Sequence, residues 1–509
     1  MIGCPVGLDP PASNIEPEPM TVTVTRSDPR YPALRRGHNL RWPSHDADAA
    51  QRILLCEDAE DASVALQQVV TAGLRPTVRS GGHCYEDFVV NNPGGAILDV
   101  SALSWVNRDA SNGTFHLGSG VQLWNGYEAL YKRYGVTLPG GVCGTVGAGG
   151  HISGGGYGPL SRLHGLSCDW VTAVNILTVD RHGKVVPIRA DAENHSDLFR
   201  ACRGAGGASF GLITDFEFAT LPMAPREAAQ ASISFSWNDM TLEKLTRILM
   251  TFGKYWESRG QERDTWGMYS VLELSHRSAG KFSVSVQFCN PDGTCRDLSV
   301  MWEYLGLFSQ WSSETGGSTA RPSIKQSDWL NACAMSAGNA VNRRGKYKSA
   351  HMLRGFTPAE AAIIYKYLTK DVDGTSLHEA SFDAHSYGGA VNRKERVEQT
   401  AVSQRDSIIK LQPLTYWEKP EEDAAQTKWL AQFYEELYSG PNTDPQHSGT
   451  PYWSEQYQGC YINYPDVDML QYNYWPQLYY GESNYAFLQT VKRRYDPNNV
   501  FHHAMSVRP

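Results

Sequence analysis

The chain of 509 residues is 41% hydrophobic and 20% charged, a composition typical of a folded protein of two to four domain-sized units. Its formal net charge of −8 and its lack of a basic tract argue against a nucleic-acid or anionic-membrane surface. No run approaches the roughly twenty apolar residues of a membrane span. We therefore expect no nucleic-acid partner and no membrane.

Residues 1–45 are interpreted as a leader, since their beginning is rich in proline and glutamate and lacks the layout of a signal peptide. Ten cysteines are too few for a disulfide scaffold in so long a chain, which predicts a reducing, cytoplasmic location. Cys289 and Cys295 flank a turn and could pair, although free thiols are favoured. No CxxC pair or spaced histidine cluster indicates a metal site.

The first half of the chain alternates short apolar runs with helical segments. Residues 52–57, 58–74 and 75–80 predict a strand, a helix and a strand that lead directly into Gly81, Gly82 and His83. Further elements are expected in this order: a strand at 95–100, a helix over 121–134 capped by Gly135, a hairpin of 170–179 and 184–188, a helix at 195–203 and a strand at 210–218. Two prolines shortly after residue 220 then mark a domain boundary, which gives a first domain over 46–223.

Longer amphipathic helices follow from about residue 230 to residue 450. The pattern predicts a helix from Leu242, strands at 266–274 and 281–289, a helix over 296–307, and a capping box at 357–360 that opens a helix to about residue 368. This order indicates an antiparallel sheet with helices on one face, in a second domain over 224–455. Residues 456–509 return to an aromatic-rich, turn-rich sequence, and eight of the 26 tyrosines lie between Tyr452 and Tyr480. These tyrosines are suited either to core packing or to a pocket in which their side chains stack on the rings or sugars of a ligand.

A glycine-rich stretch at 140–169 is the most unusual part of the sequence. Ten of its first nineteen residues are glycine, which is typical of a backbone that lies against a ligand or takes positive φ values. Cys143 lies at its entrance, and His83 follows two glycines about sixty residues upstream. An isolated cysteine or histidine is more often a packing residue. Two nucleophilic side chains on two glycine-rich loops together predict a clamp on one large, flat cofactor.

Common nucleotide and nucleophile motifs do not account for these glycines. None of the clusters has the G-x-G-x-x-G spacing of a dinucleotide fold, and there is no P-loop. One G-x-S-x-G occurs at 207–211, but a helix is expected before it and a strand after it, the reverse of a hydrolase nucleophile elbow. A pyridine-nucleotide dehydrogenase, a P-loop enzyme and an esterase are all disfavoured.

Six motifs follow one another along the chain: RSGGH at 79–83, VCGTVGAGGHISGGGYG at 142–158, LFRACRGAGGASFG at 198–211, YINYPD at 461–466, YGESNY at 480–485 and DPNNVF at 496–501. They resemble, in the same order, motifs of the berberine bridge enzyme-like flavin oxidases of the vanillyl-alcohol-oxidase superfamily. They are similar especially to antibiotic-tailoring members such as the hexose oxidases of glycopeptide-antibiotic pathways. The resemblance implies an α+β fold with a PCMH-type FAD-binding domain, an inserted substrate domain, and a C-terminal segment, 456–509, that returns to the FAD domain.

The same resemblance implies FAD attached twice, through its 8α-methyl group to His83 and through C6 to Cys143. The glycine loops would offer backbone N–H groups to the pyrophosphate. Other cofactor-binding residues implied in this way are Arg79, Ser80, Gly81, Gly82, Gly144, Val146, Gly147, Gly149, Gly150, Gly155, Gly156, Gly158, Asp169, Ile213 and Asn463.

The family reaction moves a hydride from a C–H bond to flavin N5 while a base takes the O–H proton. Tyr464 matches the base, although a tyrosine with a pKa near 10 needs help from its neighbours or loses its proton as the hydride leaves. Tyr157 resembles a second catalytic tyrosine, with ring packing as the alternative. Tyr387 and Gln412 are substrate-side candidates. Plant bridge-forming enzymes carry a glutamate close to the position of Gln412, so its absence favours alcohol oxidation.

The sequence thus predicts an oxidase for an alcohol of a sugar or a glycosylated secondary metabolite, with O2 as the acceptor and H2O2 as the product. Onward oxidation of a primary alcohol to a carboxylic acid is included in this prediction. A flavin dehydrogenase with another acceptor and a non-catalytic flavin- or ligand-binding protein are the alternatives.

Overall fold

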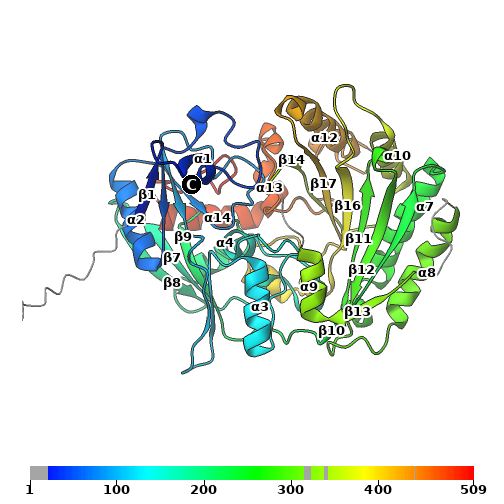
Figure 1. The fold of residues 1–509 in the computed structure, drawn as a ribbon, viewed down its shortest axis with the longest axis horizontal. Coiled ribbons are helices and arrows are strands. Elements are labelled where there is room, and N and C mark those ends of the chain that lie inside the picture. Colours follow the sequence, from blue (N-terminus) through cyan, green and yellow to red (C-terminus); the bar gives the residue numbers. More distant parts are fainter. Residues whose placement is uncertain (1–20, 315–321, 338–341, 441) are drawn as a thin grey trace, which may run out of the picture.

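Three β-sheets form two halves that face each other across the middle of the molecule (Figure 1). The computed structural model describes residues 21–314, 322–337, 342–440 and 442–509. A four-stranded and a five-stranded sheet build the N-terminal half, and an eight-stranded sheet builds the other half. The α+β prediction is confirmed.

The four-stranded sheet contains β1 (Val22–Thr25), β2 (Arg52–Leu55), β3 (Pro76–Arg79) and β4 (Ala96–Asp99), in the order β1-β2-β4-β3. Helix α2 (Ala59–Thr71) crosses from β2 to β3, and both strands run parallel to β4, as the sequence predicted. The Asp58 carboxylate caps α2 by accepting from the Asp61 N–H at 2.8 Å.

The leader prediction is wrong at its C-terminal end. Strand β1 pairs with β2, and the Tyr31 ring is buried in the core of this sheet, so residues 22–45 belong to the N-terminal half. Residues 1–20 lie outside the described residues. The turn-rich composition hid a short strand whose alternation covers only four residues.

The five-stranded sheet is antiparallel throughout. Its strands are β5 (Val106–Arg108), β6 (Phe115–Gly118), β7 (Ala173–Val179), β8 (Val185–Asp191) and β9 (Leu212–Phe218), in the order β5-β6-β9-β7-β8. Helices α3 (Leu123–Tyr134), α4 (Ala148–Ser153), α5 (Ser161–His164) and α6 (Ser196–Ala201) connect them. Gly135 ends α3 with φ at 68°, which confirms the predicted glycine cap.

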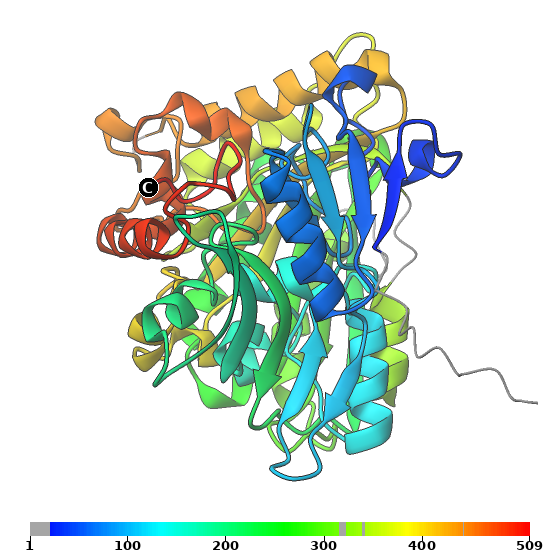
Figure 2. The same cartoon turned by 90° about the vertical axis from the view of Figure 1, so that its left-hand side faces the viewer.

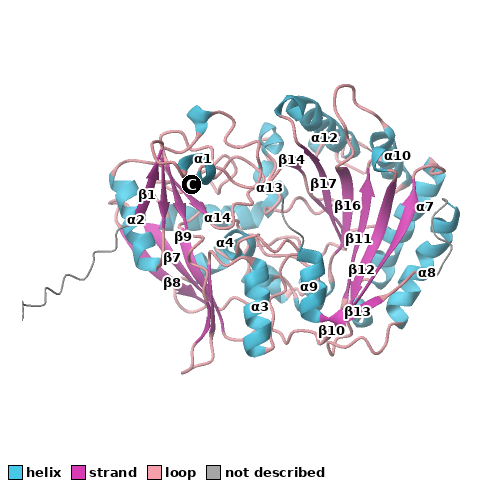
Figure 3. Cartoon of the chain, viewed as in Figure 1, coloured by secondary structure: helices cyan, strands magenta, loops and turns pink. Residues whose placement is uncertain are grey.

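The eight-stranded sheet carries helices on its outer face and turns its other face toward the N-terminal half (Figures 1 and 3). Its strands, all in antiparallel pairs, are β10 (Glu227–Ser236), β11 (Met268–Ser275), β12 (Lys281–Phe288), β13 (Lys325–Asp328), β14 (Arg344–Tyr347), β15 (Ala350–Met352), β16 (Ala380–Ser386) and β17 (Ile409–Trp417). Among the covering helices are α7 (Leu242–Arg259), α8 (Ser299–Glu314), α10 (Pro358–Thr369) and α12 (Asp423–Leu437). The short helices α9 (Trp329–Ala337) and α11 (Glu395–Gln399) complete this half. The predicted sheet with helices on one face and the capping box of α10 are confirmed.

The last helices, α13 (Trp475–Tyr480) and α14 (Glu482–Tyr495), bring the chain back to the N-terminal half, where α14 packs on α6. In Figure 2 the red helix α14 lies beside the green strands of that half. The buried Lys492 ammonium on α14 holds this arrangement by donating to the Ser209 carbonyl at 2.7 Å and to the Asp496 carboxylate at 2.6 Å.

Cys289 and Cys295 are free thiols, as favoured from the sequence. Within the described ranges, no helix combines the length and the apolarity that crossing a bilayer demands.

Candidate active site

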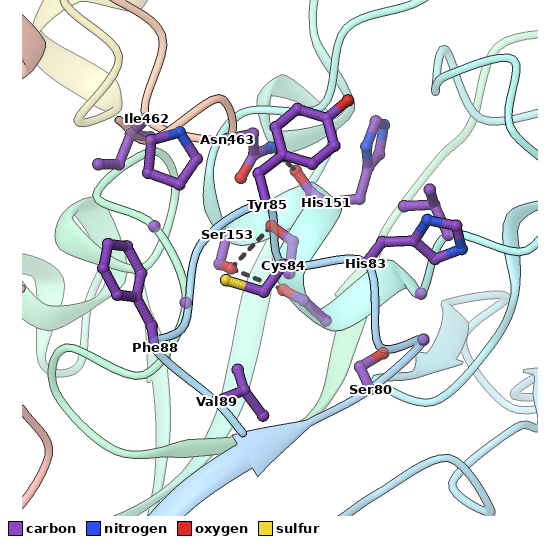
Figure 4. A pocket seen from close by; sticks show the side chains of 18 of the residues that line it. Ser80, His83, Cys84, Tyr85, Phe88, Val89, His151, Ser153, Ile462 and Asn463 are labelled. Carbon is purple, nitrogen blue, oxygen red and sulfur yellow. Dashed lines mark hydrogen bonds between the residues drawn. The ribbon is translucent and has the colours of Figure 1, made fainter. Parts of the chain in front are cut away.

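A cavity of about 600 Å³ lies between the two halves and collects most of the predicted site residues. Figure 4 shows part of its wall, with Ser80 and His83 at the right, Tyr85 and Asn463 at the upper centre and Ile462 at the upper left. The predicted residues that line it are His83, Cys143, Arg79, Ser80, Gly81, Gly82, Val146, Gly147, Gly149, Gly150, Gly158, Ile213, Asn463, Tyr157, Tyr464 and Gln412. Segments separated by hundreds of residues therefore converge on one space.

Glycine allows the two reactive loops to pack directly against each other. A Cβ atom on Gly81 would lie 2.4 Å from the Gly147 backbone nitrogen, and one on Gly147 would lie 2.0 Å from the Ser80 hydroxyl oxygen. By contrast, a Cβ on Gly150 would meet nothing within 4 Å, because this residue borders the open cavity. Some of these glycines thus fix the contact between the loops, while others leave room for a large bound group.

His83 and Cys143 meet at one end of the cavity. The His83 ring stacks on the His38 ring with centroids 3.6 Å apart, and its Nε2 atom lies 2.9 Å from the Thr145 hydroxyl. The Cys143 sulfur lies 3.7 Å from the same hydroxyl. Burial, with a smaller contribution from His38, lowers the pKa of His83 to about 3, so this imidazole is neutral at physiological pH.

These observations fit a flavin. Two nucleophilic atoms converge beside a cavity of suitable size, and glycine backbone from three separate segments borders that cavity. The residues that would hold it are therefore those of the two loops, together with the Gly206–Gly207 turn and Asn463.

A tyrosine and a buried lysine form a second region of the cavity wall, one that contains titratable groups. The Lys410 Nζ atom is hydrogen-bonded to the Tyr464 hydroxyl at 3.0 Å and lies 4.1 Å from the centre of that ring. Burial lowers the pKa of Lys410 to about 7, an effect that Asp383 partly opposes. Burial also raises the pKa of Tyr464 above its usual value. A neutral amine beside a neutral phenol is therefore the arrangement that burial favours near neutral pH.

Tyr157 and Gln412 complete the wall around this pair. The Tyr157 hydroxyl donates to the Ser386 carbonyl, and Lys410 Nζ lies 5.2 Å from the centre of the Tyr157 ring. The Gln412 amide donates to the Tyr85 hydroxyl at 3.1 Å. Gln412 therefore keeps its side-chain carbonyl available for a hydroxyl group in the cavity.

A buried ionic cluster fixes the turn that carries Tyr464. The Lys346 ammonium lies 2.6 Å from both the Glu86 and the Asp466 carboxylates, and all three side chains are almost fully buried. The Tyr347 ring, next in sequence, stacks on Tyr85 at 3.6 Å on the cavity side. Three distant segments are thus held together behind Tyr464.

Five predicted site residues do not line the cavity but support it from behind: Gly144, Gly155, Gly156, Asp169 and Tyr387. Asp169 forms a buried ion pair with Arg405, with hydrogen bonds of 2.8 and 3.0 Å. Tyr387 packs behind Tyr157, and its hydroxyl donates to the Gln404 carbonyl at 3.1 Å.

The glycines in this set have backbone roles. Gly155 and Gly156 adopt positive φ values of 117° and 78°, a turn that an L-side chain would strain. The Gly144 carbonyl accepts from the Trp124 N–H at 2.9 Å at the start of α3. All five residues lie next to the lining residues of the cavity without lining it themselves.

Sequence reasoning missed Lys410, Thr145 and His38. Lys410 lies on β17, where a lysine between two apolar residues, Ile409 and Leu411, was the only available signal. Thr145 and His38 gave no signal, because their contacts come from the packing of loops far apart in the chain.

Comparison with known proteins agrees with the class that the fold and cavity define, a flavin-binding oxidoreductase. Residues 50–189 match the FAD binding domain family, and residues 460–508 match the berberine and berberine like family.

The chain is 34% identical to aclacinomycin-N/aclacinomycin-A oxidase of Streptomyces galilaeus, covering 96% of this chain and 90% of that protein. It is 33% identical to hexose oxidase of Chondrus crispus, covering 95% and 94%. The structure of the glycopeptide hexose oxidase DBV29 complexed with teicoplanin superposes with a TM-score of 0.86 at 31% identity, covering 96% and 99%. The chain belongs to the berberine bridge enzyme-like family of FAD-linked oxidoreductases.

Proposed function

We propose that this protein is an oxidase that removes a hydride from an alcohol carbon of a sugar or glycosylated metabolite and delivers the electrons to O2, forming H2O2. The observation that carries the proposal is the Lys410–Tyr464 pair at 3.0 Å, in the same cavity as His83 and Cys143. Carbinol oxidation requires a hydride acceptor and a proton acceptor within reach of the same carbinol group, and one cavity offers a place for both.

The cofactor would be FAD held by two covalent bonds, one to His83 and one to Cys143. Both side chains border the cavity, and His83 is neutral and therefore nucleophilic. When bound, the flavin supplies the hydride acceptor. The protein's own part is to hold that ring still, to exclude water and to manage the substrate proton.

Tyr464 takes the carbinol proton in this proposal, and Lys410 makes that possible. Because burial raises the pKa of Tyr464, its hydroxyl does not ionise by itself near neutral pH. A neutral Lys410 amine can accept the phenolic proton as Tyr464 accepts the substrate proton, so no isolated phenolate has to form. Tyr157 would contribute through its ring, which lies under the ammonium that develops on Lys410.

The substrate class rests on the wall around this pair. Gln412 offers an amide rather than a carboxylate, so it can hydrogen-bond a hydroxyl group but is not a base. Tyr85, Tyr269 and Tyr416 add ring faces and hydroxyls to the same lining, a combination suited to a sugar. A primary alcohol would give an aldehyde, whose hydrate is again an alcohol and could be oxidised to the acid.

Two measurements test the proposal. Intact mass of the denatured wild type should show bound flavin that survives in His83→Ala and in Cys143→Ala but is lost in the double variant. Peroxide release should follow the addition of oligosaccharides or glycosylated antibiotics in air. Anaerobic bleaching of the flavin without reoxidation by air would instead support the dehydrogenase alternative. The absence of bleaching with every glycoside would support a binding protein.

A further inference from the structure

The Thr145 hydroxyl stands between the two residues that the proposed function assigns to the flavin. Its oxygen lies 2.9 Å from His83 Nε2 and 3.7 Å from Cys143 Sγ. Thr145 belongs to a tight turn closed by the Val146 N–H donating to the Cys143 carbonyl at 3.2 Å. Since Gly81 packs against the Thr145 carbonyl, this turn is also fixed relative to the His83 loop.

The hydrogen-bonding state of His83 follows from its surroundings. A neutral imidazole carries one N–H and one lone pair, and the partner of one nitrogen decides where the proton resides. Over the described part of the chain, Nε2 is the His83 ring atom with a hydrogen-bond partner, the Thr145 hydroxyl. An Nε2–H that donates to Thr145 leaves the lone pair on Nδ1. The stacked His38 ring shields one face of the imidazole from water.

The Thr145 hydroxyl can then donate its own proton in a hydrogen bond to the Cys143 sulfur. Once Thr145 Oγ1 accepts from His83, its O–H can donate to Cys143 Sγ, the other polar atom within reach. One hydroxyl therefore contacts both nucleophilic atoms and orients them relative to each other.

We propose that Thr145 is the positioning residue for covalent flavin attachment, through the relay His83 Nε2–H to Thr145 Oγ1 and Thr145 O–H to Cys143 Sγ. The inference rests on the bicovalent attachment proposed above. It makes one side chain responsible for both linkages.

The chemistry balances with O2 as the oxidant. At His83, an Nδ1–C8α bond forms, the methyl group loses one proton, and Nε2 loses its proton toward Thr145. At Cys143, an S–C6 bond forms while the C6 hydrogen and the thiol hydrogen leave as protons. Each bond places two electrons on the ring system, and one O2 accepts them with the two protons to give one H2O2.

The test compares Thr145→Val, which keeps the shape and removes the hydroxyl, with Thr145→Ser, which keeps the hydroxyl. Full-length protein from riboflavin-limited cells is mixed with FAD in air, and each linkage is followed by peptide mass. We expect Thr145→Val to form both bonds about three- to tenfold more slowly, the loss typical of one hydrogen bond. Thr145→Ser should stay close to the wild-type rate, and the histidyl bond in the wild type and in Thr145→Ser should be to Nδ1.

Wild-type rates at both sites in Thr145→Val, or attachment through Nε2, would overturn the inference. Thr145→Ala is the replacement if Thr145→Val does not fold, and tryptophan fluorescence and non-covalent FAD binding report the fold in each case. A wild type that forms no covalent bond would instead overturn the cofactor proposal. The two failures are therefore distinguishable without any activity measurement.

Discussion

Two regions of the cavity wall are built from different kinds of residue. In the tether region, close contacts between glycines bring His83 and Cys143 together on loops of the N-terminal half. In the proton-transfer region, buried polar side chains from β17 and from the C-terminal segment meet, with Lys410 beside Tyr464. Backbone geometry dominates the first region, and burial of titratable groups dominates the second. Substitutions in the two regions should therefore have different consequences.

The largest effect is expected from Tyr464→Phe. Removing the group that takes the carbinol proton should slow anaerobic flavin reduction by about 10³-fold, within the range for a lost general base. Covalent flavin content and melting temperature should stay near those of the wild type. A variant that reduces its flavin at more than a tenth of the wild-type rate would show that another group is the base.

Lys410→Met should come second, with flavin reduction slowed by about 10²-fold, because Tyr464 then has no partner for its own proton. Methionine fills a similar volume, and replacing a buried amine by an apolar group does not destabilise the fold as breaking an ion pair would. Stopped-flow reduction across pH is the measurement, and the melting temperature is the control. A large fall in melting temperature together with the fall in reduction rate would point to a structural role alone.

In the tether region, around His83 and Cys143, Gly81→Ala should lower the stability of the fold rather than slow proton transfer. Its Cβ would collide with the Gly147 nitrogen, so the loops must separate at a cost of about 1–3 kcal/mol. The matched control is Gly150→Ala, which meets no protein atom within 4 Å and should unfold like the wild type while taking up less flavin. Denaturant unfolding of the pair without flavin separates the two roles. Equal unfolding midpoints would contradict the packing account.

The smallest effect is expected from Tyr157→Phe. The Tyr157 hydroxyl already donates to the Ser386 carbonyl, and the ring that faces Lys410 is kept in phenylalanine. We expect less than about a tenfold decrease in the rate of flavin reduction, the cost of one hydrogen bond. A loss as large as that of Tyr464→Phe would instead make Tyr157 a proton-transfer residue.

The sequence predicted the tether region, around His83 and Cys143, better than the proton-transfer region, around Lys410 and Tyr464, and the reason is physical. Local glycine patterns signal a backbone that touches a ligand, so the loops around His83 and Cys143 could be found directly. The role of Lys410 depends on its alignment with His385 across two strands and on its burial against a residue 54 positions away. Such long-range pairing leaves no local pattern.

The fold shows the same division. The capping box at 357–360, the glycine cap at Gly135 and the amphipathic helix from Leu242 were predicted from short patterns and are present. Strands were missed in both halves, among them β10, β16 and β17. β17 contains a proline, which argues against a central strand when only the sequence is considered. Sequence does not separate a residue that lines a cavity from one directly behind it, such as Asp169 or Tyr387.

The pH dependence of anaerobic flavin reduction tests the central claim most directly. A pKa of about 7 for Lys410 means that the amine is neutral, and able to accept the Tyr464 proton, above that pH and charged below it. The reduction rate of the wild type should therefore fall about tenfold per pH unit below pH 7 and level off above it, and Lys410→Met should lose this dependence. A wild-type rate that is flat from pH 5 to pH 9, or the same slope in Lys410→Met, would contradict the account.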